Sequence, residues 1–164
     1  MTTETTSSTT TSAITKTTTN TWLLRGAALL WIVWGLVHTL AGVLTMSGST
    51  TMAVQSIADA VEPSTLDMDY AAAVGAIINQ HGFNLMWIGV VTIVCAVFIW
   101  RRSVRAIFLA ALVGGLADVG YFVFLDLGGF VNFLPGTLMT LFSATAIIVT
   151  VAVYIADRRR TRTS

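Results

Sequence analysis

The sequence predicts an all-α integral membrane protein, an antiparallel four-helix bundle with amphipathic helices in its first outer loop. Two observations support this prediction. Apolar residues make up 55% of the 164-residue chain and gather in four long runs, and all nine Lys and Arg residues lie on alternate segments between these runs. A chain of this length has too little polar surface to enclose four apolar helices in a soluble fold. The sequence therefore favours a membrane protein.

Each of the four apolar runs is long enough to cross a bilayer. A helix that rises about 1.5 Å per residue needs roughly 20 apolar residues to cross a hydrocarbon core about 30 Å thick. Lipid offers the backbone no hydrogen-bond partner, and the runs lack the period-2 alternation of barrel strands, so we expect helices. The expected spans are residues 27–46, 82–100, 106–125 and 133–155.

The positions of the basic residues predict the orientation of these spans. Basic residues mark the cytoplasmic segments of membrane proteins. We therefore expect a multi-pass plasma-membrane protein with both termini in the cytoplasm. The net charge of only +1 gives no indication of a nucleic-acid partner, and the basic clusters suit the anionic headgroups of the lipid bilayer. They precede the first run, join the second and third, and follow the fourth: Lys16, Arg25, Arg101, Arg102, Arg105, Arg158, Arg159, Arg160 and Arg162.

The chain divides into three regions. Residues 1–20 are rich in Thr and Ser and cannot bury enough apolar surface to offset the entropy of ordering, so we expect a disordered cytoplasmic tail. Residues 21–157 form the four-span domain, and residues 158–164 form a basic cytoplasmic tail. The first apolar run is longer than the apolar region of a signal peptide and lacks a clear A-x-A-like cleavage site after it, so we expect it to be retained.

The first outer loop, residues 47–81, is too long for a simple connector. Apolar residues recur in it at helical spacing over residues 54–61 and again over 70–78, which predicts two short amphipathic helices. Pro63 and Ser64 resemble a helix start, so the second span can begin outside the membrane, near Leu66. The loop either covers the bundle as a lid or rests on the lipid headgroups.

His38 and Asp118 are the candidate catalytic residues. They are the ionisable side chains furthest from any span end, and an ionisable residue inside a membrane is a functional candidate by default. His38 lies thirteen residues beyond Arg25, and Asp118 thirteen residues beyond Arg105. Both should therefore lie roughly 20 Å from the inner boundary, where they could meet. A paired carboxylate would orient the imidazole as a general acid or base; alternatively, the two residues form only a structural hydrogen bond.

Further polar and aromatic residues of the first three spans could line an outward-facing pocket around this pair. Helical spacing places Trp34 on the stripe of His38 and places Tyr121 on the stripe of Asp118. Such a pocket would suit a small hydrophobic ligand, such as a lipid, isoprenoid or quinone. The candidate ligand-binding residues are Trp34, His81, Asn84, Tyr121 and Asp126.

No metal or other cofactor follows from the sequence. His38, His81 and Asp118 are suitable ligands for a metal or a haem, but His81 should lie roughly 10 Å above His38, and no single helix has the H-x-x-x-H or E-x-x-H spacing of a metal site. We therefore expect no metal and leave the cofactor unknown. Cys95 is the only cysteine, which excludes an internal disulfide.

The activity stays open, and so does the question of whether the chain is an enzyme. The leading hypothesis is binding or acid/base conversion of a small hydrophobic molecule at His38 and Asp118. One alternative is a non-catalytic subunit that assembles with a membrane-protein partner. Another is a small proton-coupled transporter that works as a homo-oligomer. In that case Gly35, Gly42, Gly82 and Gly89 could form the contacts between copies.

Overall fold

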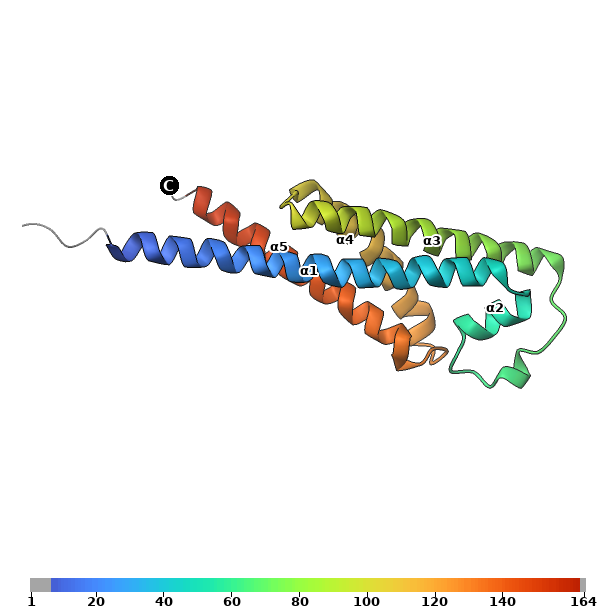
Figure 1. Ribbon diagram of the computed structural model, residues 1–164. Coiled ribbons are helices and arrows are strands. Elements are labelled where there is room, and N and C mark those ends of the chain that lie inside the picture. The colour runs from blue at the N-terminus through green and yellow to red at the C-terminus, as the bar shows by residue number, and fades with distance from the viewer. Residues whose placement is uncertain (1–6, 163–164) are drawn as a thin grey trace, which may run out of the picture.

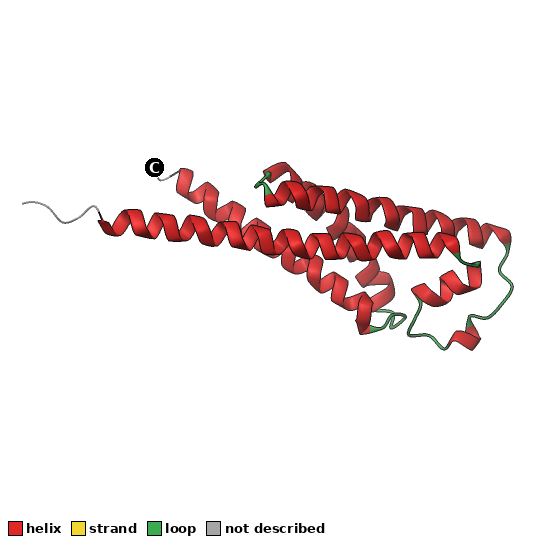
Figure 2. Cartoon of the chain, in the orientation of Figure 1, coloured by secondary structure: helices red, strands yellow, loops and turns green. Residues whose placement is uncertain are grey.

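The computed structural model describes residues 7–162, and for residues 7–19 and 161 it describes the backbone alone. Over this range the chain forms five α-helices, a short 3₁₀ helix and two π-helical turns, with no strand. Figure 2 shows helices and loops only, with the longest loops in the connection between the first and second long helices. The predicted all-α class is confirmed.

Four helices are long and apolar enough to cross a membrane. They are α1 (Ser7–Ser47), α3 (Ala72–Trp100), α4 (Val104–Tyr121) and α5 (Leu138–Thr161); the π-helical turns η2 (Phe122–Asp126) and η3 (Phe133–Thr137) extend α4 and precede α5. The stretches that qualify as spans contain the four expected runs and extend further at one or both ends: Asn20–Ser47, Ala72–Trp100, Val104–Asp126 and Phe133–Arg160. The prediction of four apolar helices is therefore confirmed.

The terminal regions are described only in part. Residues 1–6 and 163–164 lie outside the described residues, and α1 begins at Ser7, within the segment for which the sequence predicts a disordered tail. Thr and Ser are weak helix formers, and no side-chain packing is described before Asn20. The disorder of residues 1–20 stays a prediction. At the other terminus, α5 includes the first residues of the expected basic tail 158–164.

The α1–α3 contact is the most extensive in the molecule, and glycines make it close. A Cβ atom on Gly35 would lie 2.7 Å from the carbonyl oxygen of Gly89, and a Cβ atom on Gly42 would strike the carbonyl oxygen of Gly82. Small residues let membrane helices approach backbone to backbone. These four glycines, considered above as contacts between copies, therefore lie in a contact within one chain. The helix α1 also contacts α5, and α4 contacts both α3 and α5.

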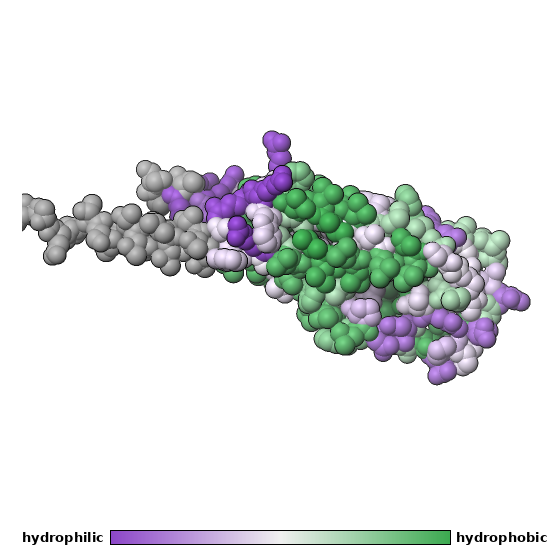
Figure 3. Space-filling model, in the orientation of Figure 1, coloured by the Kyte–Doolittle hydropathy of each residue, from purple (hydrophilic) through white to green (hydrophobic). Residues whose placement is uncertain are grey.

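The described residues bury small side chains and expose large apolar ones. The core consists mostly of small side chains together with Trp31 and Trp34, which are 1% and 0% exposed. Large apolar side chains point outward instead, among them Leu112 at 59% and Ile148 at 67% exposure. Figure 3 shows an apolar belt between hydrophilic regions on the face in view. Exposed apolar surface on this scale suits contact with lipid rather than water.

The connection between α1 and α3 folds back over the end of the molecule. It contains α2 (Thr50–Ile57), which begins with the hydroxyl of Ser49 accepting a hydrogen bond from the amide of Met52, and η1 (Pro63–Thr65). The helix α2 contacts both α1 and α3. The second apolar stripe of this loop belongs largely to the start of α3, which begins at Ala72 rather than near Leu66. We call this end of the molecule the α2 end (Figure 1).

Three hydrogen bonds join this connection to the turn between α4 and α5. The backbone amide of Asn132 donates to Asp59 Oδ1 at 2.6 Å, and its side-chain amide donates to the carbonyl oxygen of Asp59 at 2.9 Å. The amide of Ala60 donates to the carbonyl oxygen of Phe130 at 3.2 Å. We call these three bonds the Asp59–Asn132 clasp. The clasp holds the two connections together over the α2 end.

Candidate functional site

A cavity of about 270 Å³ lies at the α2 end of the molecule. The long helices, together with the turns η2 and η3, supply most of its lining, and Ser56, Ile57 and Asp59 of the folded-back connection supply the rest. The walls of the cavity are mostly apolar, with polar groups at a few positions. The remaining lining residues are Val37, His38, Ala41, Leu44, Thr45, His81, Leu85, Asp118, Tyr121, Leu125, Pro135, Gly136 and Met139.

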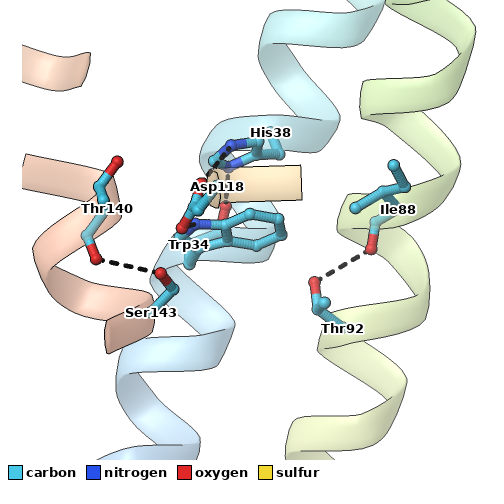
Figure 4. A network of polar contacts seen from close by, with 7 residues as sticks. All are labelled: Trp34, His38, Ile88, Thr92, Asp118, Thr140 and Ser143. Atoms are coloured by element: carbon cyan, nitrogen blue, oxygen red, sulfur yellow. Dashed lines mark hydrogen bonds and ion pairs between the residues drawn. The ribbon is translucent and has the colours of Figure 1, made fainter. Parts of the chain in front are cut away.

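His38 and Asp118 face each other in the lining of this cavity. Nε2 of His38 on α1 lies 3.9 Å from Oδ1 of Asp118 on α4, and Asp118 is only 4% exposed (Figure 4). This distance is longer than a hydrogen bond, yet an approach of about 1 Å would form one. The two groups are thus close enough to exchange a proton after a small movement.

Trp34 supports both members of the pair from below the cavity. Its Nε1 donates a 2.8 Å hydrogen bond to Oδ2 of Asp118, and its ring stacks on the His38 imidazole with 3.6 Å between the ring centroids. Trp34 and His38 lie one helical turn apart on α1, which places them on the same face. The indole therefore restrains the carboxylate by a hydrogen bond and the imidazole by stacking.

The contacts of His38 assign its tautomer. Its Nδ1 lies 2.8 Å from the carbonyl oxygen of Trp34, and a carbonyl oxygen can only accept, so Nδ1 bears the proton. In the neutral imidazole Nε2 then presents a lone pair toward Oδ1 of Asp118. If one proton is shared between Nε2 and Oδ1, the pair is either a neutral imidazole with a carboxylic acid or an imidazolium with a carboxylate. Both forms have zero net charge. Either form avoids an isolated charge in an apolar setting.

Ser143 of α5 lies on the other side of Asp118. Its hydroxyl donates a 3.0 Å hydrogen bond to the carbonyl oxygen of Thr140. The hydroxyl of Thr140 is buried and has no hydrogen-bond partner in the described part of the chain. The hydrogen bond that orients the Asp118 carboxylate comes from Trp34 of α1.

The structure separates the five predicted ligand-binding residues. His81 and Tyr121 line the cavity with the His38–Asp118 pair, whereas Trp34 lies beneath the pair. Asp126 stands outside the lining: its Oδ1 accepts a 2.6 Å hydrogen bond from Thr137, and its buried Oδ2 has no partner among the described residues.

Asn84 also lies outside the cavity lining. It accepts a 3.1 Å hydrogen bond from Nε1 of Trp87, which is itself 39% exposed. Asn84 lies outside the lining because of the way α3 is rotated about its own axis. The face of that helix that carries Gly82 and Gly89 packs on α1, and Asn84, two residues after Gly82, points away from this face.

Sequence reasoning missed three polar residues of the cavity, one of which, Ser56, donates its hydroxyl to the carbonyl oxygen of Ala53. Thr45 is buried near the end of α1, and its hydroxyl donates to the carbonyl oxygen of Ala41, so it presents little free polarity. Asp59 reaches the cavity because the clasp fixes it there. Its acidic character is visible in the sequence, but its place over the cavity depends on Asn132, a partner 73 residues away.

The glycines beside Asp118 serve packing rather than ligand space. A Cβ atom on Gly114 would lie 2.6 Å from the ring of Trp31, and one on Gly115 would lie 2.9 Å from the side chain of Ile147.

Among the described residues, no group of three or more His, Cys, Asp or Glu side chains stands close enough together to hold a metal ion.

The four helices are long and apolar enough to span a membrane, which suggests a helical membrane protein, and the candidate site is a cavity with a His–Asp pair in its lining. Comparisons with known protein families, with curated proteins and with solved structures found no match for this chain. Its function is therefore argued from the cavity itself.

Proposed function

We propose that this protein binds a small, largely apolar molecule at His38 and Asp118 and exchanges a proton with it. The proposal places the four spans as an antiparallel bundle in the plasma membrane, with both termini in the cytoplasm. The alternating basic segments support this orientation. The α2 end would then face outward, with the α2 segment as an amphipathic cover over the cavity.

The observation that supports the proposal best is the position of the His38–Asp118 pair in the lining of a cavity. Structural polar pairs between membrane helices are usually packed against side chains, whereas this pair adjoins about 270 Å³ of space. An apolar cavity of about 150 Å³ holds benzene. The present cavity can therefore take a ring with short substituents, such as the ring of a quinone or the end of an isoprenoid or lipid.

The charge of the lining narrows the class of ligand. Two carboxylates, Asp59 and Asp118, and two imidazoles line the cavity, and its described lining residues include no Lys or Arg. An anionic group would meet repulsion from the carboxylates without a compensating cation. We therefore expect the polar group of the ligand to be neutral or cationic.

The pair also supplies the chemistry that the proposal requires. Nε2 of His38 can accept a proton from a bound hydroxyl or ammonium group, and the Asp118 carboxylate would then stabilise the imidazolium. The reverse transfer returns the proton to the ligand. The hydrogen bond from Nδ1 to the Trp34 carbonyl keeps Nε2 as the atom that exchanges the proton.

Native mass spectrometry of the protein, purified in mild detergent from its own membrane, tests this proposal. We expect one small apolar molecule per chain, absent from Asp118→Asn and from Ala41→Phe, which fills the cavity without altering the pair. Asp69→Asn removes an exposed carboxylate outside the cavity and should keep the molecule. A bare wild-type chain that co-purifies with another polypeptide would instead favour the assembly-subunit hypothesis.

A further inference from the structure

We propose that a second cavity, at the opposite end of the molecule, binds the phosphate of a membrane phospholipid. This cavity of about 200 Å³ lies between α1, the start of α4 and the end of α5. It shares no residue with the first cavity, so this proposal rests on the membrane placement in the proposed function but not on its ligand chemistry. We call this end of the molecule the arginine end.

The cavity is apolar on one side and charged on the other. Leu24, Ile107 and Val153 are buried and form its apolar wall, whereas Arg102 and Arg158 form a charged rim. It lies where the apolar stretches end, because α4 begins at Val104 and the fourth span extends to Arg160. A phospholipid has the same polarity at this depth, with a phosphate next to the start of its acyl chains.

The backbone at Arg102 places an arginine where glycine is usual. Its φ of 65° is left-handed, and it follows the end of α3, with its amide donating to the carbonyl oxygen of Ile99 at 2.8 Å. Side chains with a Cβ atom disfavour this conformation, and helices most often end there with Gly. The guanidinium of Arg102 donates to the Thr21 hydroxyl of α1, which holds it at the rim. An arginine at a position that suits glycine indicates a use for its charge.

The other charged groups of the rim are also held in place. The Arg158 guanidinium lies 5.3 Å from the centroid of the Tyr154 ring, and both residues line the cavity. Asp157 accepts a 2.7 Å hydrogen bond from the side-chain amide of Asn20. Two arginines and one aspartate give the rim a charge of +1, which matches the single negative charge of a phosphate diester.

Lipid titration with matched charge variants tests the site. The delipidated protein in mild detergent is titrated with phosphatidylglycerol, and bound lipid is counted by native mass spectrometry. The double variant R102Q/R158Q removes the rim charges, and R101Q/R159Q removes two neighbouring charges that do not line the cavity. We expect wild type to retain one lipid, the first variant to bind it about tenfold or more weakly, and the second to stay within about twofold. An equal loss in both variants would overturn the site in favour of general attraction between charges.

Two further measurements complete the test. Glycine suits the left-handed turn, so the unfolding temperature of Arg102→Gly in lipid-free detergent should be no lower than that of Arg102→Gln. The lipid affinity of Arg102→Gly should still fall by about tenfold. Unchanged lipid binding in a folded Arg102→Gly protein would contradict the proposal. Inorganic phosphate at millimolar concentration should not displace the lipid, because it lacks the chains that contact Leu24 and Ile107. Displacement would assign the site to free phosphate and overturn its assignment to a lipid.

Discussion

Nε1 of Trp34 donates a 2.8 Å hydrogen bond to Oδ2 of Asp118, and this bond joins α1 to α4 across 84 residues of sequence. Both residues are buried, so neither group can replace its partner by water. The bond sets the direction of the Asp118 carboxylate and leaves Oδ1 facing His38. The geometry of the candidate site therefore begins with an indole that lies outside the cavity lining.

Removing this donor should destabilise the protein. Trp34→Phe leaves Oδ2 of Asp118 without its indole partner and leaves a gap in the core, so we expect a loss of about 2–4 kcal/mol in the free energy of unfolding. Trp87→Phe is the matched control because Trp87 also donates to a side-chain oxygen, that of Asn84, but is 39% exposed. It should cost less than about 1 kcal/mol. Unfolding by denaturing detergent measures both values, and equal losses would contradict the role of Trp34.

Replacing the carboxylate should separate binding from folding. Asp118→Asn keeps an oxygen that can accept from Trp34 but removes the group that can share a proton with His38. We expect ligand affinity to fall by at least about tenfold, while the free energy of unfolding changes by less than about 1.5 kcal/mol. Ligand retention in native mass spectrometry and detergent unfolding measure the two effects. Unchanged ligand retention would show that the carboxylate is not part of the binding site.

The glycine contact between α1 and α3 should tolerate no added methyl group. A Cβ atom on Gly35 would lie 2.7 Å from a backbone oxygen of α3, so Gly35→Ala must push the helices apart and should cost about 1–3 kcal/mol. Gly120→Ala provides the control, since a Cβ atom there meets nothing within 4 Å. It should leave stability unchanged or raise it slightly. A Gly35→Ala protein with the stability of wild type would show that α1 and α3 do not pack this closely at Gly35.

Breaking the Asp59–Asn132 clasp should loosen the cover of the cavity. Asn132→Ala removes the side-chain donor to the Asp59 carbonyl oxygen while keeping the backbone bond to Oδ1. We expect amide hydrogen exchange to increase by about three- to tenfold over residues 58–61, with little change in α3. A bound molecule in the cavity should also dissociate faster. Protection equal to that of wild type would show that the remaining bonds hold the connection closed.

The equivalent depths of His38 and Asp118 could be predicted from the sequence, because distance along a helix depends only on the number of residues and the rise per residue. Their mutual approach could not. Residues of one helix share a face through local geometry, but the face that points at a neighbouring helix depends on packing across the whole interface. Asn84 illustrates the difference: its height along α3 suits the cavity, but the packing of α3 on α1 leaves it outside the lining, where Trp87, one turn further along the same helix, donates to it.

The sequence by itself determined that this protein is helical, with four apolar helices long enough to span a membrane, because lipid allows the backbone few alternatives and leaves the pattern visible in one dimension. Only the tertiary structure decided which polar residues share a cavity. Close packing at Gly35 and Gly89 sets how α1 and α3 lie together, and the clasp carries Asp59 over the α2 end. Both depend on contacts between residues far apart in the chain, which no local pattern encodes.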